Sequence, residues 1–282
     1  MVERAASAGR VRRVAAALMA AALLPAAAQA QAAQYRRVVG DTVRYREVTH
    51  ATSEIAAPQG AMTIRSEHDA RLALAFARGD TARAWYEALS LRSAYPGGES
   101  VPETALLLGR PFLLTMGARG DVATLATPEL PKAVAEVTDL TRQFEDFFVK
   151  LPAGPLRPGL EWTDTTSRET PLAAGRTLRT QRIGRFRVRG DTMVGGARGV
   201  VIETRMQNRI ESTGPSPTPG MNMRTLQAGT ETGTFVFSPA EGRLLARSRE
   251  GALEGEIEFT GGPQPVRIPQ KMTYQSTIER VR

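Results

Sequence analysis

The chain has 282 residues, which is long enough for one large β domain or two small ones. Its formal net charge is +8. It contains no cysteine and two histidines. Disulfide bonds, thiolate catalysis and cysteine-ligated metals are therefore excluded, and a histidine-based metal centre has few ligands available. We expect no cofactor and no metal.

Residues 1–30 have the pattern of a secretory signal peptide. A basic region with Arg10, Arg12 and Arg13 precedes the alanine- and leucine-rich run of residues 14–28, and Ala28-Gln29-Ala30 fits a small-x-small cleavage site. The apolar run is shorter than the roughly 20 residues of a membrane span, and no later segment reaches that length. We expect a periplasmic or secreted protein with no transmembrane segment after cleavage; the alternative is an uncleaved N-terminal anchor.

Residues 31–282 are predicted to form a β-rich domain. Apolar and polar residues alternate in runs separated by glycine-containing turns, as at residues 43–46 and 186–189. Alternation with a period of two is typical of antiparallel strands that have one buried and one solvated face. We therefore predict a mainly β fold with a curved antiparallel sheet, arranged either as a half-barrel or as two packed sheets.

Three Arg-Gly-Asp tripeptides, at residues 78–80, 119–121 and 189–191, fall between such alternating runs. Gly adopts positive φ at no steric cost, and Asp hydrogen-bonds to nearby backbone, so the pair favours a tight turn. We predict a turn at each position and not an adhesion motif.

One segment breaks the strand pattern. Apolar residues recur every three or four positions from Leu130 to Phe148, which is typical of an amphipathic helix. Pro131 fits the first turn of such a helix, and Leu151-Pro152 would end it. We predict one central amphipathic helix at about 128–150, joining two similar halves at residues 35–127 and 156–282.

The segment that follows resembles a motif of exported bacterial proteins. Leu151-Pro152 and the later Gly159-Leu160-Glu161-Trp162 match a Leu-Pro…Gly-x-x-Trp pattern of an uncharacterised family of exported β-rich proteins. The resemblance implies an envelope protein and transfers no catalytic residue. In fold alone, antiparallel strands around one helix are similar to lipoprotein-carrier half-barrels, in which a curved sheet cradles a hydrophobic ligand.

No catalytic constellation stands out. His50 and His68 are the two histidines, and there is no Gly-x-Ser-x-Gly nucleophile motif to accompany either of them. Glu161 and Asp164, on either side of Trp162, are the best carboxylate pair for a hydrolase. We expect a protein that is not an enzyme, and a hydrolase is the weakest alternative.

The largest apolar side chains suggest a ligand site. If the curved sheet leaves its interior open, a set of aromatic residues would line an apolar cavity: Trp85, Phe144, Phe147, Phe148 and Trp162. A filled core would use the same residues. We predict a binding module for a lipid or another apolar or amphiphilic ligand, with a structural protein that docks to an envelope partner as the alternative.

Most of the positive charge is arginine, distributed along the predicted strands, as at residues 185–189. Nucleic-acid binders concentrate basic residues on one patch, so we expect no nucleic-acid partner. Solvated strand faces account for this pattern, and contact with an anionic membrane surface is the alternative explanation.

Overall fold

The described part of the chain is built mainly from long antiparallel β-strands. A computed structural model describes residues 32–57, 60–141, 143–171, 175–216 and 218–281. The predicted signal peptide, residues 1–30, lies outside these described residues.

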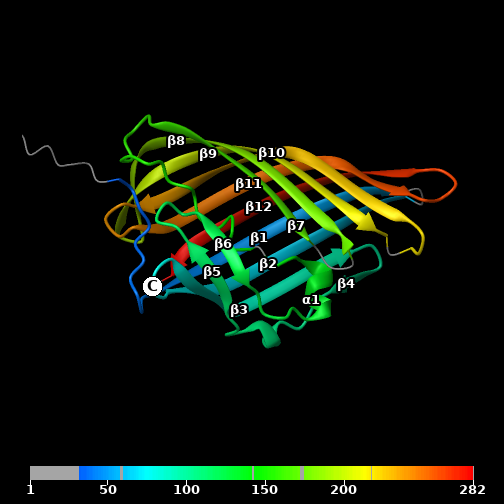
Figure 1. Cartoon of the computed structure of the whole chain (residues 1–282), viewed down its shortest axis with the longest axis horizontal. Coiled ribbons are helices and arrows are strands. Elements are labelled where there is room, and N and C mark those ends of the chain that lie inside the picture. Colours follow the sequence, from blue (N-terminus) through cyan, green and yellow to red (C-terminus); the bar gives the residue numbers. More distant parts are fainter. Residues whose placement is uncertain (1–31, 58–59, 142, 172–174, 217, 282) are drawn as a thin grey trace, which may run out of the picture. The chain divides into compact units, whose positions relative to one another are not determined.

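Twelve strands form one sheet in the described residues (Figure 1). The N-terminal strands are β1 (Thr42–Ala57), β2 (Gly60–Phe76), β3 (Thr81–Tyr95), β4 (Gly98–Ser100), β5 (Phe112–Met116) and β6 (Val122–Ala126). The C-terminal strands are β7 (Glu161–Pro171), β8 (Thr177–Val194), β9 (Ala197–Pro215), β10 (Asn222–Ser238), β11 (Arg243–Thr260) and β12 (Val266–Val281).

The sheet is open, and its two arms meet at its centre. The strand order is β6-β5-β3-β2-β1-β12-β11-β10-β9-β8-β7, with β4 beside β3, and every pair is antiparallel. β1 pairs with β12 from Arg44↔Val281 to Ile55↔Gln270, so the first and last strands join the arms. The predicted mainly β class is confirmed as a single curved sheet; the division into similar halves stays a prediction.

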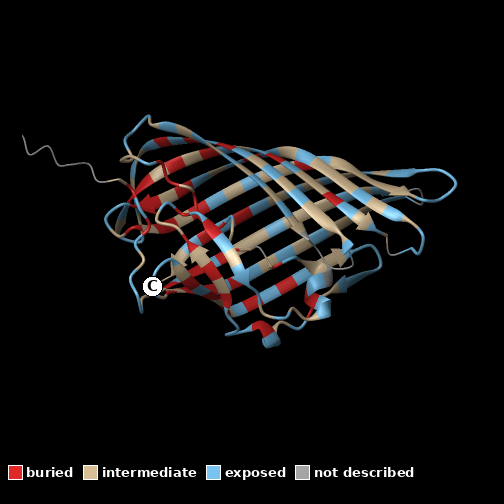
Figure 2. Cartoon of the chain, viewed as in Figure 1, coloured by how far each residue is buried: buried red, intermediate tan, exposed pale blue. Residues whose placement is uncertain are grey.

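Alternation along the strands separates an inner face from an outer face. On β1, Val43, Tyr45 and Glu47 are buried, while Arg44 and Arg46 between them are exposed. Buried positions concentrate near one end of the strands, and half-buried positions prevail toward the other end (Figure 2). The inner face thus has a filled core at one end and a more accessible region at the other.

Inner-face glycines allow β10 and β11 to approach each other closely. An ideal Cβ at Gly229 would lie 1.9 Å from the Ala252 carbonyl oxygen, and one at Gly255 would lie 1.8 Å from the Leu226 carbonyl oxygen. Because those neighbours are backbone atoms, a side chain at either position would push the strands apart. Glycine within a strand is typical of tight bends in curved sheets.

The predicted helix at 128–150 is wrong beyond its first turns. Helix α1 (Lys132–Val137) has six residues, and Thr138 is already extended, with φ −155° and ψ 150°. Residues 138–141 and 143–151, together called the strap, then continue through turns, in which Gln143 donates to the Leu140 carbonyl and Phe147 donates to the Phe144 carbonyl. The apolar spacing of three to four is satisfied by consecutive turns. A 3-10 turn, η1 (Ala105–Leu107), occurs earlier in the chain.

Two of the three Arg-Gly-Asp segments form the predicted turns. Gly79 and Gly120 have φ of 75° and 92°. The third prediction, at 189–191, is wrong, because these residues lie within β8 at a bulge between Val188 and Gly190. Gly195 and Gly196, with φ of 54° and 79°, make the β8–β9 turn instead.

Candidate ligand-binding site

The strap aromatics lie together in the filled core. Phe144 and Phe147 are each 1% exposed, and Phe148 is 8% exposed. The Phe147 ring lies 5.1 Å from the Tyr45 ring, and the Phe144 ring lies 5.2 Å from the Phe112 ring, both edge to face. Three of the five predicted site residues are therefore packed against the sheet and against one another.

The two tryptophans of the predicted site lie elsewhere. Trp162 on β7 stacks on Phe186 of β8 at 5.1 Å between ring centroids, and its Nε1 donates to the Lys150 carbonyl at 3.0 Å. Trp85 is half-buried on β3, in the opposite phase to the buried neighbours Ala84 and Tyr86. Trp85 therefore lies on the outer face and does not join the strap aromatics.

A buried ion pair fixes the strap against the sheet. Glu47 Oε1 on β1 and Arg247 Nη2 on β11 are 3.1 Å apart. Arg247 Nη1 also donates to the carbonyl oxygens of Asp146 and Phe147, and Gln143 Nε2 donates to Glu47 Oε2 at 2.6 Å. Burial, followed by the nearby charge of Arg249, lowers the pKa of Arg247 to about 9.

A second set of charged residues lies one step further along the inner face. Glu231 on β10 is 1% exposed, accepts a hydrogen bond from the Tyr274 hydroxyl, and lies 3.7 Å from Arg249 Nη1. Within the described residues, Glu231 Oε1 and Arg249 Nε have no hydrogen-bond partner. Buried polar atoms without a hydrogen-bond partner are uncommon in folded proteins.

Tyr274 reaches Glu231 by lying across a glycine. In the sheet register, Glu231 is opposite Gly251, and Gly251 is opposite Tyr274. A Cβ at Gly251 would lie 2.7 Å from both Cζ and the hydroxyl oxygen of Tyr274. The missing side chain at Gly251 therefore lets the tyrosine bridge from β12 to β10. Burial and the Glu231 carboxylate raise the pKa of Tyr274.

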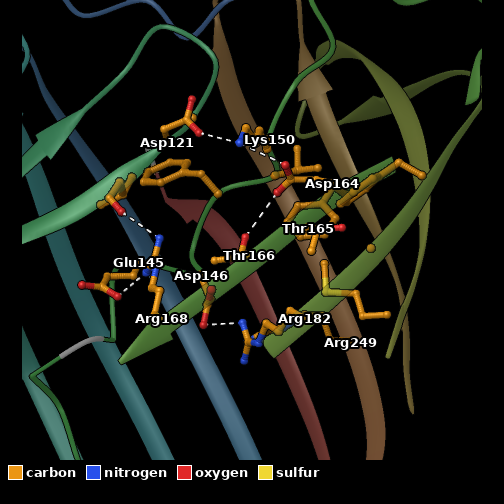
Figure 3. Close-up of a pocket in the computed structure, with 18 of the residues that line it drawn as sticks. Asp121, Glu145, Asp146, Lys150, Asp164, Thr165, Thr166, Arg168, Arg182 and Arg249 are labelled. Carbon is orange, nitrogen blue, oxygen red and sulfur yellow. Dashed lines mark hydrogen bonds and ion pairs between the residues drawn. The ribbon is translucent and has the colours of Figure 1, made fainter. Parts of the chain in front are cut away.

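A pocket of about 290 Å³ lies beside these charges, where the free edges of β6 and β7 approach each other (Figure 3). We call this region the seam. Its lining combines apolar side chains with eight charged residues: Asp121, Glu145, Asp146, Lys150, Asp164, Arg168, Arg182 and Arg249. The four acidic and four basic groups balance, so the pocket wall carries no net charge.

Ionic contacts cross the seam at two places. Lys150 Nζ lies 3.0 Å from carboxylate oxygens of both Asp121 and Asp164 (Figure 3). Deeper in, Arg168 of β7 pairs with Glu145 of the strap, and its Nη2 lies 3.5 Å from the Val122 carbonyl of β6. These side chains join two strand edges that share no backbone ladder in the described sheet.

Beyond the pocket, the inner face carries half-buried apolar side chains instead of buried charged ones. Apolar side chains here follow the same phase as Tyr274 and are only half-buried: Ile64, Ile210, Ile257, Ile268 and Met272. The outer face of the same rows carries Glu54, Lys271 and Glu254, which lie opposite one another on β1, β12 and β11. Along the strands, the inner face therefore passes from a charged pocket to a more apolar, half-buried region.

The residues considered for hydrolysis do not come together. Asp164 pairs with Lys150, whereas Glu161 lies on the outer face within 3.5 Å of Arg187. Burial lowers the pKa of His68, and its Nε2 has no hydrogen-bond partner within the described residues. His50 and His68 lie on opposite faces of the sheet, because the register partner of His68 on β1 is Thr49, the residue next to His50. Across the part of the chain that the structure describes, no group of three His, Asp or Glu side chains could hold a metal ion.

No family model and no curated protein matches the chain. Among solved structures, an outer membrane channel from Pseudomonas putida F1 aligns with 88% of this chain and 97% of that one, at 10% sequence identity and a TM-score of 0.20. A score this low carries no argument about fold or function. The resemblance to an exported β-rich family stays a prediction. No helix in the described residues is long and apolar enough to span a membrane.

Proposed function

We propose that this chain is an exported envelope protein that binds an amphiphilic ligand and is not an enzyme. The polar head of the ligand would occupy the pocket at the seam, and its apolar part would lie along the half-buried isoleucines and methionines of the inner face. The export pattern of residues 1–30 supports the envelope location.

One observation carries the proposal: a pocket lined by charged side chains lies on the inner face, whose rows further along the strands carry half-buried apolar side chains. Arg249 lines the pocket, and its Nε has no hydrogen-bond partner within the described residues. The pocket volume of about 290 Å³ is near the lower limit of small-molecule sites, roughly 300 Å³. It suits a headgroup better than a whole lipid.

The balanced charges of the pocket narrow the class of headgroup. Four carboxylates and four basic side chains line it, so a ligand with one strong net charge gains no overall attraction. A neutral or zwitterionic head that both donates and accepts hydrogen bonds fits best. The expected ligand is therefore a zwitterionic or uncharged amphiphile, and a simple fatty acid should bind less tightly.

Native mass spectrometry with organic extraction of the purified chain, followed by titration with a fluorescent lysophosphatidylcholine, tests this proposal. Met206 lines the pocket and is half-buried, so Met206→Trp should fill the pocket and weaken probe binding about tenfold. Met193→Trp is the matched control, because Met193 is 64% exposed. Absence of extracted lipid together with no probe binding would overturn the proposal.

The second candidate function, docking to an envelope protein partner, is favoured by the free edge of β7. This strand, Glu161–Pro171, pairs with β8 alone in the described sheet. A strand edge without a backbone partner can accept a strand from another chain, which would here replace the side-chain contacts of the seam. A purified partner that binds Met206→Trp normally but fails to bind Thr163→Pro would support this function over the first.

A further inference from the structure

Charged residues on the outer face of β7, β8 and β9 are mostly matched across strands. Arg189 Nε lies 2.6 Å from Glu203 Oε1, and Arg179 Nε lies 2.8 Å from Glu169 Oε2. Arg187 lies 3.5 Å from Glu161. Opposite charges placed across neighbouring strands stabilise a sheet, whereas like charges directly opposite destabilise it.

Arg185 and Arg205 break this pattern. They are register partners on β8 and β9, and both are exposed. Within the described residues, no carboxylate lies within ion-pair distance of either guanidinium. A hollow of about 540 Å³ on the outer face is lined by both of them, together with Arg187 and Arg189. Two like charges are therefore held face to face at the side of an accessible hollow.

The register neighbours of this pair on β7 and β10 carry hydroxyl groups, and the carboxylate of Glu203, on the same face of β9, pairs with Arg189. Thr163 lies opposite Arg185 on β7, and Thr232 lies opposite Arg205 on β10. Each guanidinium offers a planar set of N–H donors whose geometry matches the oxygens of a phosphate. A phosphate group between the two arginines would relieve their repulsion and accept hydrogen bonds from both.

We infer that Arg185 and Arg205 form a docking site for the phosphate groups of an anionic phospholipid surface. The hollow is open, and four arginines against two glutamates line it, so one small anion would gain few contacts while a surface would meet several arginines together. The chain without residues 1–30 keeps a formal charge of about +5, which favours association with an anionic surface. This inference does not depend on the amphiphile pocket, which opens on the inner face.

Co-sedimentation of the purified chain with phosphatidylcholine vesicles, with and without phosphatidylglycerol, tests the inference. Binding should require phosphatidylglycerol, and Arg185→Gln combined with Arg205→Gln should reduce the partition constant by at least about fivefold. Arg65→Gln combined with Arg83→Gln removes the same charge from the outer face of β2 and β3 and should leave binding within about twofold.

Three further results would contradict the inference. Equal losses in the two double variants would show that net charge alone governs binding. Full competition by inorganic phosphate would show a soluble phosphate site instead of a surface site. Arg205→Lys keeps the charge but loses the planar donor set. Its partition constant should therefore lie between those of the native chain and the double variant. A native-like partition constant would contradict recognition of phosphate by the planar guanidinium. Circular dichroism of each variant confirms folding before binding is compared.

Discussion

Arg247 and Glu47 meet at 3.1 Å with side chains 1% and 2% exposed, on strands separated in the sheet by β12. The same guanidinium donates to two carbonyl oxygens of the strap. One arginine therefore satisfies backbone groups that a continued helix would have paired internally. The buried pair explains both why the strap is irregular and why it stays in place against the sheet.

Removing the arginine alone should destabilise the fold strongly. Arg247→Met leaves Glu47 buried without its cation and two carbonyl groups without a donor, so the free energy of unfolding should fall by about 3–5 kcal/mol. Urea unfolding followed by circular dichroism measures this change. The double variant Arg247→Met with Glu47→Leu should recover much of the loss, because no unpaired charge remains.

An exposed pair serves as the control for this experiment. Arg92 and Glu99 are 2.7 Å apart, with side chains 53% and 40% exposed. Arg92→Met should leave the unfolding midpoint unchanged, since solvent screens such pairs. A similar midpoint shift in Arg92→Met and Arg247→Met would contradict the role given to the buried pair.

The close approach of Tyr274 to Gly251 gives a second prediction. Gly251→Ala places a methyl group within contact distance of the Tyr274 ring, so the ring must move away from Glu231, at a cost of about 1–3 kcal/mol. Gly255→Ala should cost more, because its Cβ would meet a backbone carbonyl at 1.8 Å. Thermal unfolding of both variants, with Gly154→Ala as the unobstructed control, checks this order. The reverse order would contradict the close approach of β10 and β11 at Gly255.

Because several tyrosines are buried, we predict that folding stability falls at alkaline pH. Burial is the main cause that raises the pKa of Tyr35, Tyr45, Tyr86 and Tyr274. A tyrosine in the unfolded chain ionises near pH 10, so the unfolded state loses these protons first as the pH rises. Stability should be complete below about pH 10 and should fall above it, by up to about 1.4 kcal/mol per pH unit for each tyrosine. The lowered pKa of Arg247 acts in the opposite direction and raises stability as the pH rises, but it is one group against four tyrosines.

Tyr86→Phe isolates one of these tyrosines. Its hydroxyl is buried without a hydrogen-bond partner in the described residues, so its removal should not reduce stability at neutral pH. The fall in the free energy of unfolding above pH 10 should become less steep in this variant. Tyr95→Phe, at a residue 45% exposed, should change neither property. Urea unfolding across a pH series tests this, and an unchanged alkaline slope in Tyr86→Phe would refute it.

The strand pattern could be predicted from the sequence because it depends on local alternation. Val43, Tyr45 and Phe186 lie on the buried face in the phase that alternation predicts. The helix prediction failed at residues where a distant partner decides the conformation. Spacing of three to four residues does not distinguish a helix from consecutive turns, and the arginine that holds the Phe147 carbonyl lies 100 residues further along the chain.

The pocket could not be predicted, although the sequence carries a signal for its charges. Glu47 follows Val43 and Tyr45 in the same phase, and Glu231 precedes Phe235 and Phe237 in the same phase. A charge in the apolar phase of a strand indicates a buried polar contact. Its partner is not local: Arg247 lies 200 residues from Glu47. Trp85 does not join the strap aromatics, because its side chain lies on the outer face of β3.

The seam contacts give a prediction that depends on the proposed ligand. Lys150 joins Asp121 and Asp164 at 3.0 Å each, and these three side chains are 35%, 55% and 23% exposed. Because the group is partly solvated, Lys150→Met should change the free energy of unfolding by less than about 1 kcal/mol. It should nevertheless loosen the boundary of the pocket, so a bound lysophosphatidylcholine probe should dissociate several times faster.

Stopped-flow displacement of the probe measures that rate. Lys271→Met is the matched control, because Lys271 pairs with Glu254 at 3.3 Å on the outer face, away from the pocket. A faster rate in Lys150→Met with an unchanged rate in Lys271→Met places the ligand path at the seam. Equal rates in both variants and the native chain would mean that the ligand enters elsewhere, and the open end of the inner face, next to Ile257 and Ile268, would then be the path to test.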